Sequence, residues 1–153
     1  THIGGMSASP PLTETADCLC LASRRAARSI TRAFDRRLRV HGLRATQFTL
    51  LASLALQGER PLGELAAFIG VDRTTLSRNV ALTEARGLLA SRRADGDART
   101  RLLRITPEGR AVLDAAFATW REVQAGLTGA IGPDAADGLR RLSRGGAAAG
   151  AFA

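Results

Sequence analysis

Two short helical patterns separated by three residues constrain this chain more than any other feature of its sequence. The first covers residues 62–69 and has apolar side chains at the i, i+3, i+4 and i+7 positions. Gly70 is placed to end this helix, and Asp72 is placed to cap the next one by accepting hydrogen bonds from its free amides. Two helices joined by so tight a turn predict a helix-turn-helix motif.

The second helix of this motif, expected from Arg73 to about Arg86, has a polar outer face. Leu76, Val80 and Thr83 are spaced to pack inward against the first helix. A helix that enters the major groove of DNA, about 12 Å wide, must offer hydrogen-bonding side chains to base edges. The side chains that meet this need are Arg73, Thr74, Thr75, Ser77, Arg78 and Asn79. A solvated amphipathic helix is the alternative, although Glu and Lys are more usual on such a face.

The periodicity changes from helical to extended after Gly87. Residues 88–93 and 99–105 predict two strands joined by a turn at residues 94–98. Such a hairpin beside a helix-turn-helix motif is a wing, which contacts the DNA backbone or the minor groove. The wing candidates are Arg93, Asp97, Arg99 and Arg101, with Arg99 expected at the tip and Asp97 expected to orient its guanidinium group. Ordinary turn chemistry is the alternative explanation of the acidic residues.

Long helical patterns flank this central region. Thr106-Pro107 is a strong helix start, because a capping hydroxyl precedes a proline at the first helical position. The apolar stripe that follows requires a partner helix. We therefore expect a mainly α (α+β) winged helix-turn-helix fold with dimerisation helices. Its expected parts are a flexible segment at 1–16, dimerisation helices at 17–44 and 107–144, a DNA-binding lobe at 45–106, and a flexible tail at 145–153.

The net charge of +8 and the sequence pI near 11.5 favour a polyanionic partner such as nucleic acid. All 22 basic residues are Arg, and five of them form a stripe along the first long helix, of the kind that is usually a solvated face. The members of this stripe are Arg25, Arg28, Arg32, Arg36 and Arg39. The charge therefore adds to the prediction of DNA binding without carrying it alone.

Several classes of protein are disfavoured by the residues present. The sequence contains no catalytic triad spacing, phosphate loop or cluster of metal ligands, so we expect neither an enzyme nor a metal or other cofactor. No stretch is apolar enough to span a membrane and no signal-peptide layout precedes the helices, so a cytoplasmic location is expected. Two rivals remain: a winged-helix module for protein contacts, and a DNA binder of low sequence specificity.

The region from Pro61 to Gly109 resembles the MarR (multiple antibiotic resistance regulator) family. The matching motifs are Leu65-Ala66, Gly70-Val71-Asp72-Arg73, Glu84-Ala85-Arg86-Gly87-Leu88-Leu89, Asp97-Ala98-Arg99 and Leu103-Arg104-Ile105-Thr106-Pro107-Glu108-Gly109. With the flanking helices the resemblance extends from about Asp17 to Leu142. Pro61 and Gly63 depart from the family, which often has Ser or Thr there, so the first motif helix is expected to be poorly capped.

The resemblance implies a homodimer that binds double-stranded DNA at an imperfect palindrome and usually represses nearby genes. It also implies an inducer site between the dimerisation helices and the DNA-binding lobe, for a small aromatic ligand or an oxidised cysteine. The residues eligible to line a ligand site, by the elements they occupy, are His41, Arg44, Phe48 and Trp120.

Cys20 resembles in its placement the sensing cysteine of organic hydroperoxide regulators in this family. The chain has no Tyr to bind its thiolate, so Arg24 and a helix N-terminus are the expected substitutes. Cys18 is the candidate resolving thiol. The alternative is that both cysteines are simply small, partly buried residues.

Overall fold

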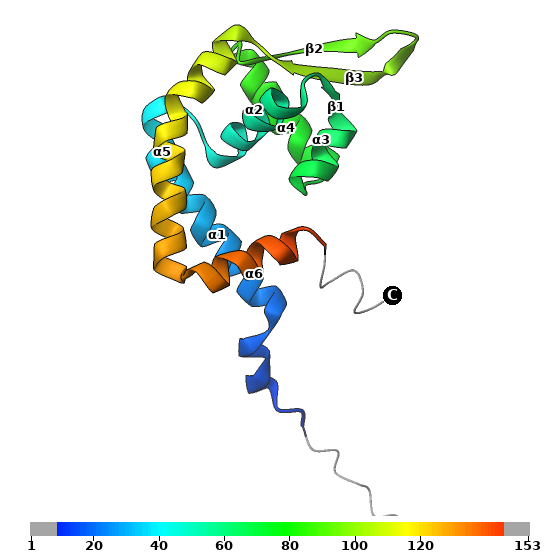
Figure 1. Cartoon of the computed structure of the whole chain (residues 1–153). Helices are drawn as coiled ribbons and strands as arrows, with labels where there is room; N and C mark the ends of the chain where they lie inside the picture. Colours follow the sequence, from blue (N-terminus) through cyan, green and yellow to red (C-terminus); the bar gives the residue numbers. More distant parts are fainter. Residues whose placement is uncertain (1–8, 146–153) are drawn as a thin grey trace, which may run out of the picture.

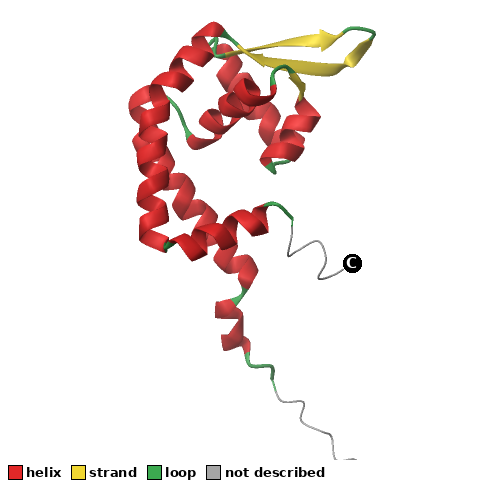
Figure 2. Cartoon of the chain, viewed as in Figure 1, coloured by secondary structure: helices red, strands yellow, loops and turns green. Residues whose placement is uncertain are grey.

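The computed structural model describes residues 9–145. Residues 1–8 of the segment expected to be flexible at 1–16, and residues 146–153 of the tail expected at 145–153, lie outside this range, whereas Leu12–Asp17 forms a 3-10 helix. The structure confirms the predicted fold class, because the described chain is mostly helical with one small sheet (Figures 1 and 2). The helices are α1 (Leu19–Leu38), α2 (Ala45–Gln57), α3 (Leu62–Ile69), α4 (Arg73–Ala85), α5 (Pro107–Ile131) and α6 (Pro133–Ser143). Two 3-10 helices, Leu12–Asp17 and Arg39–His41, precede and follow α1.

The chain forms a lobe and a pair of long helices that lead away from it (Figure 1). The lobe contains α2, α3, α4 and the hairpin, and α1 and α5 lie side by side beyond it. The helix α6 turns away from the far end of α5 and passes across α1 in this view (Figure 1). The helices therefore begin and end close to the predicted places, with α1 starting at Leu19 rather than Asp17 and α4 ending at Ala85.

The sheet has one strand more than the sequence predicted. Strands β2 (Leu89–Ala94) and β3 (Asp97–Ile105) form the expected hairpin, with a turn of only two residues at Asp95-Gly96. The short strand β1 (Arg60–Pro61) pairs with the other edge of β3, so the strand order is β1-β3-β2, antiparallel throughout. Two residues are too few for a period-2 pattern, and β1 is therefore visible only in the structure.

The core joins the lobe to the long helices. Its most buried side chains come from α1, α2, α3, α4 and β3, and they are Leu38, Leu50, Leu51, Leu54, Leu65, Leu76, Val80 and Leu103. Leu113 and Ala116 extend the same cluster onto α5. Because one continuous apolar cluster connects the elements, the lobe is held in a defined position on the base of α1 and α5.

The start of α5 is fixed tightly to the end of the helix-turn-helix motif. The Thr106 hydroxyl accepts a hydrogen bond from the Gly109 amide at 3.0 Å and donates one to the Gly87 carbonyl at 2.6 Å. Gly109 passes so close to Leu88 that a Cβ atom at Gly109 would lie 1.9 Å from the Leu88 carbonyl oxygen. The predicted cap is confirmed, and only glycine fits at this crossing.

Candidate nucleic-acid interface

The outer face of α4 carries the side chains that the sequence predicted there. Arg73, Thr74, Thr75 and Arg78 are exposed, while Ser77 is half-buried. Leu76, Val80 and Thr83 on the opposite face are almost completely buried, as predicted. The first two turns of α4 therefore present hydrogen-bonding groups to the exterior from a helix that is anchored by its apolar side.

The first turn of α4 is organised by Asp72. Its Oδ1 atom accepts from the Thr75 amide at 2.8 Å, and its Oδ2 atom accepts from the Thr75 hydroxyl at 2.9 Å. These hydrogen bonds, the backbone one first, lower the pKa of the Asp72 carboxyl below its usual value. Gly70 ends α3 with a φ of 81°, a left-handed conformation that glycine adopts without strain. The turn between the two helices is thus fixed on both sides, as predicted.

Two residues of the predicted face also contact the protein itself. The Asn79 side-chain amide donates to the Thr46 carbonyl of α2 at 3.2 Å, which braces α4 against the lobe. The Arg73 guanidinium lies over Gly63 of α3, where an added Cβ atom would be 2.1 Å from Arg73 Nη2. The start of α3 at Pro61 has no side-chain cap, as expected. Sequence reasoning placed these residues on the right helix face but did not find their intramolecular partners.

The wing differs in one respect from the prediction. Asp97 Oδ1 accepts from the backbone amide of Arg99 at 3.0 Å, and Asp97 Oδ2 accepts from the Thr100 hydroxyl at 2.5 Å. The carboxylate therefore shapes the backbone after the turn instead of orienting the Arg99 guanidinium. The same contacts, the Thr100 hydroxyl first, lower the pKa of Asp97. Arg99 lies within β3 just past the tip, and both Arg99 and Arg93 are exposed.

Arg101 is held inside the molecule more than the sequence suggested. Its guanidinium lies 2.7 Å from Glu84 Oε2 of α4, and the two side chains are 31% and 32% exposed. Glu84 Oε1 accepts from the amide and the hydroxyl of Ser91 on β2, and these bonds with Arg101 lower the pKa of Glu84. Arg101 therefore links β3 to α4. A sequence signal existed, since Arg101 lies two residues before the buried Leu103 and shares its face of the strand.

A second ion pair fixes the wing and was not predicted. Arg92 donates from Nε and Nη2 to the two carboxylate oxygens of Glu59, at 3.1 and 2.7 Å. Such a two-point contact defines the orientation of both groups. Glu59 precedes β1, so the pair joins the wing to the same segment that supplies the third strand. No local pattern relates residues 59 and 92.

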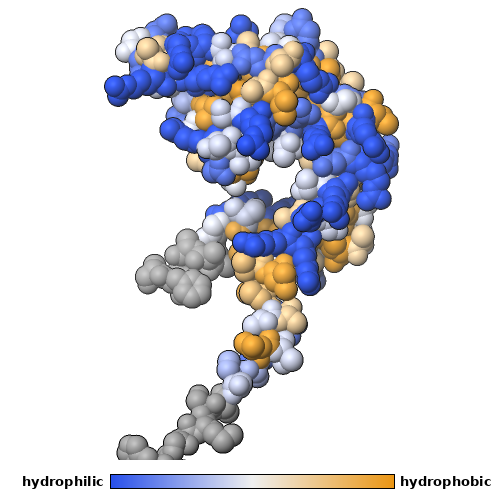
Figure 3. All heavy atoms as spheres, turned by 180° about the vertical axis from the view of Figure 1, so that it is seen from behind, coloured by the Kyte–Doolittle hydropathy of each residue, from blue (hydrophilic) through white to orange (hydrophobic). Residues whose placement is uncertain are grey.

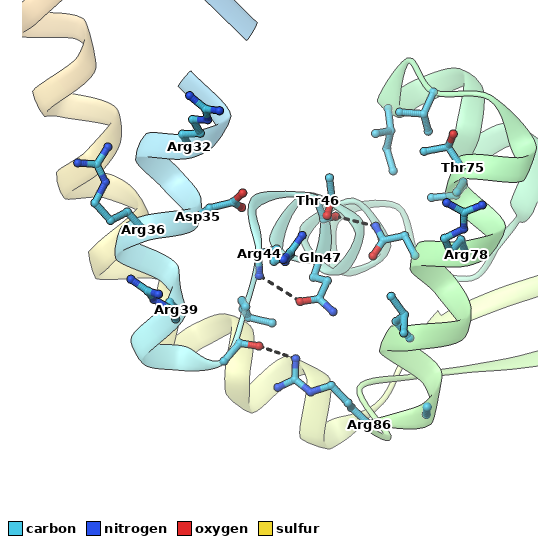
Figure 4. A pocket seen from close by; sticks show the side chains of 18 residues that line it. Arg32, Asp35, Arg36, Arg39, Arg44, Thr46, Gln47, Thr75, Arg78 and Arg86 are labelled. Carbon is cyan, nitrogen blue, oxygen red and sulfur yellow. Dashed lines mark hydrogen bonds between the residues drawn. The ribbon is translucent and has the colours of Figure 1, made fainter. Parts of the chain in front are cut away.

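Two hollows lie beside the lobe. A cleft of about 1070 Å³ separates α1 from α4, and Figure 4 shows arginines on both of its sides. A smaller pocket of about 430 Å³ lies between α2 and α5, with Phe48 and Phe117 each stacked on Trp120. Of the four residues eligible for a ligand site, Phe48 and Trp120 meet in the pocket and Arg44 lines the cleft. His41 lines neither of these hollows and is paired with the Thr119 hydroxyl at 2.8 Å.

The two cysteines lie at the N-terminus of α1 and are exposed. Cys18 is the residue that precedes the first turn of the helix, and Cys20 lies within that turn. The backbone amides of Leu21 and then of Cys20 lower the pKa of the Cys18 thiol below its usual value. The helix N-terminus thus acts on Cys18. Both thiols are accessible in the single chain.

No group of three or more metal-ligating side chains gathers anywhere within residues 9–145. Over the same residues, no helix is long and apolar enough to cross a membrane.

A short helix, a fixed turn, an exposed polar helix and a two-stranded wing define a winged helix-turn-helix protein. Residues 41–100 match a model of the MarR family. The transcriptional regulator MosR from M. tuberculosis, solved in complex with DNA, is 40% identical in sequence to this chain. The two structures superpose with a TM-score of 0.75, and the alignment covers 87% of this chain and 98% of MosR. The chain therefore belongs to the MarR family.

Two further solved structures are similar over most of their length. BpsR of Bordetella bronchiseptica, described with 6-hydroxynicotinic acid as the regulator of its DNA binding, is 25% identical with a TM-score of 0.72, covering 82% of this chain and 96% of that one. The transcriptional repressor CouR, bound to a 23-mer DNA duplex, is 26% identical with a TM-score of 0.73. The alignment covers 89% of this chain and 96% of CouR. No curated protein matches the sequence significantly.

Proposed function

We propose that this chain is a regulator of transcription that binds double-stranded DNA in a sequence-specific manner, as a homodimer on an imperfect palindrome. The outer face of α4 carries this proposal, because its first two turns expose only hydrogen-bonding groups on a helix anchored by a buried apolar side. MosR and CouR are both bound to DNA in their structures. Repression is the proposed direction, as for the repressor CouR. A cytoplasmic location belongs to the same proposal.

The DNA-binding residues are proposed in two groups. Thr74, Ser77 and Arg78 are proposed to contact base edges, with Arg78 the strongest candidate because it is exposed and a guanidinium can bind guanine at two points. Arg73, Thr75, Arg93 and Arg99 are proposed to contact phosphates or the minor groove. Asn79, Asp97 and Arg101 are proposed to position these elements, since each is bonded within the lobe or the wing.

The dimer is proposed to form through residues 17–44 and 107–144, with residues 45–106 as the DNA-binding lobe. Large apolar side chains are exposed on these helices, including Leu19 at 85%, Leu139 at 44% and Leu142 at 46%. Hydrophobic residues are visible at the end of the molecule away from the wing as well as on the lobe (Figure 3). Covering such side chains with a second copy removes apolar area from water, which favours association.

A small aromatic ligand is proposed to release the protein from DNA. The pocket between α2 and α5 is lined by stacked Phe48, Phe117 and Trp120, and by Arg110, whose Nε lies 2.9 Å from Oδ1 of Asp114 in the same lining. Flat aromatic molecules pack well on such rings, and a carboxylate on the ligand would replace Asp114 as the partner of the guanidinium. The regulation of BpsR by 6-hydroxynicotinic acid favours this class of ligand.

An oxidant is the second candidate signal, favoured by the lowered pKa of Cys18. This scheme exchanges the roles expected from the sequence, where Cys20 is the sensing thiol and Cys18 the resolving one. The Cys18 thiolate attacks a hydroperoxide, gives sulfenic acid and releases an alcohol, and the Cys20 thiol then condenses with it to a disulfide and water. Forming that bond would require the first turn of α1 to unwind, because Cys18 caps the helix and Cys20 is its second residue.

Footprinting on the DNA upstream of the gene tests this function. We expect two protected half-sites centred about 34–36 Å apart, and two copies of the chain per duplex by sedimentation. Uniform protection without preferred sites would favour the low-specificity binder, and no protection would favour a module for protein contacts. Titration with aromatic acids or with an organic hydroperoxide, using Cys18→Ser and Cys20→Ser variants, separates the two signals.

A further inference from the structure

The cleft between α1 and α4 is lined by six arginines. Arg32 and Arg36 belong to α1, and Arg39 begins the short helix after it. Arg44 precedes α2, Arg78 lies on the reading face of α4, and Arg86 follows the end of α4. Figure 4 shows the α1 arginines across the cleft from Thr75 and Arg78.

The positive charge in the cleft has little internal compensation. Asp35 is the one acidic residue of the lining, and its Oδ1 atom accepts from the Ala45 amide at 2.7 Å. Within residues 9–145, Arg32, Arg36 and Arg39 form no ion pair. Like charges three and four residues apart repel one another along a helix, so an external anion would relieve a repulsion that the fold leaves in place.

The spacing of these arginines fits an extended anion. Seven residues of helix separate Arg32 from Arg39, which corresponds to a rise of about 10 Å at about 1.5 Å per residue. The duplex rises by about 3.4 Å along its axis for each base pair, so the row is as long as about three base pairs of duplex. The stripe continues toward Arg28 and Arg25, both exposed, beyond the cleft. A small effector would be bound at one point, whereas a row of this kind is complementary to a polyanion.

We propose that Arg32, Arg36 and Arg39 form a second binding surface for the phosphate backbone of the duplex whose major groove α4 reads. The inference rests on the proposed function. Arg78 lines the cleft as well as the reading face, so the surface is continuous from the base-reading helix to α1. The contacts on α1 add affinity that does not depend on base sequence.

The salt dependence of binding tests the proposal. The Arg32→Gln/Arg36→Gln variant and the wild-type protein are titrated by fluorescence anisotropy against the upstream duplex and a shuffled duplex, at several salt concentrations. In the proposed homodimer each protomer loses two phosphate contacts, so four lost contacts should lower the slope of log K against log[salt] by about 3.6, at about 0.9 per contact. The ratio of the two affinities should stay the same. Arg39 is left in place because it lies in the connection between α1 and α2.

The Arg37→Gln/Arg121→Gln variant is the charge-matched control. Arg37 pairs with Glu122 outside the cleft, and Arg121 is exposed on α5. The salt slope of this control variant should equal that of the wild-type protein. The comparison separates the loss of local contacts from the loss of net charge. A cleft variant with an unchanged slope would overturn the proposal. The shuffled duplex separates this proposal from the proposed sequence-specific function. The salt slope measured on the shuffled duplex tests the phosphate contacts of the cleft even if the wild-type protein binds both duplexes equally.

Discussion

At the scale of single residues, Arg78 is the side chain on which base recognition depends most in this account. Arg78→Ala should reduce the discrimination between operator and shuffled DNA by about 1–3 kcal/mol, because a bidentate contact with a base edge is lost. The measurement is the ratio of the two dissociation constants at one salt concentration. An equal loss on both duplexes would instead make Arg78 a phosphate contact. Arg121→Ala, an exposed position of α5, serves as the control.

Arg99 tests the wing in the same way. Arg99→Ala should weaken binding to the operator without changing the sedimentation of the free protein, since the side chain is exposed on β3 away from the long helices. Unchanged affinity would remove the wing from the DNA-binding surface.

Gly109 tests the crossing of α5 over the end of the helix-turn-helix motif. Gly109→Ala should destabilise the fold by roughly 1–3 kcal/mol, because the new Cβ would meet the Leu88 carbonyl oxygen at 1.9 Å. A Cβ atom at Gly126 in the same helix has no neighbour within 4 Å, so Gly126→Ala should stabilise the fold by up to about 1 kcal/mol. Denaturant unfolding at one protein concentration compares them. Equal effects of the two substitutions would contradict the packing described here.

At the scale of elements, Glu84 connects α4 to both strands of the wing. Glu84→Gln should cost roughly 1 kcal/mol at neutral pH, since the ion pair with Arg101 is lost but the groups are partly exposed. The folded-state pKa of Glu84 lies below its ordinary value of 4.5, so the stabilisation is complete above that value. It should disappear as the pH falls through the lower folded-state pKa. Unfolding of both proteins as a function of pH measures the difference, and a difference independent of pH would exclude the carboxylate as its source.

The elements themselves were largely predictable, and the connections between them were not. The caps at Asp72 and Thr106 and the inward face of α4 follow from local spacing, and all are present. The third strand, the Arg92–Glu59 pair and the Asn79 contact with Thr46 join residues distant in sequence. Such contacts have no local signature. Arg101 differs from them, because its spacing from the buried Leu103 places it on the inward face of β3.

At the scale of the whole molecule, dimerisation determines whether two α4 helices can reach successive major grooves. Leu139→Glu should dissociate the dimer and weaken operator binding, because a charge would replace an exposed apolar side chain of α6 in the proposed interface. Phe68→Glu, at an exposed apolar position of α3 within the lobe, should leave the dimer intact. Analytical ultracentrifugation measures the oligomeric state of both variants. If Leu139→Glu remained a dimer, the interface would lie elsewhere.

Sequence-specific binding is the central claim, and the ratio of two affinities tests it most directly. The wild-type protein is titrated with its own upstream duplex and with a shuffled duplex of equal length and composition, at one physiological salt concentration. We predict that the upstream duplex binds at least about 10³-fold more tightly, as base-reading proteins do. A ratio near one would contradict the account, since α4 would then contact DNA without reading it.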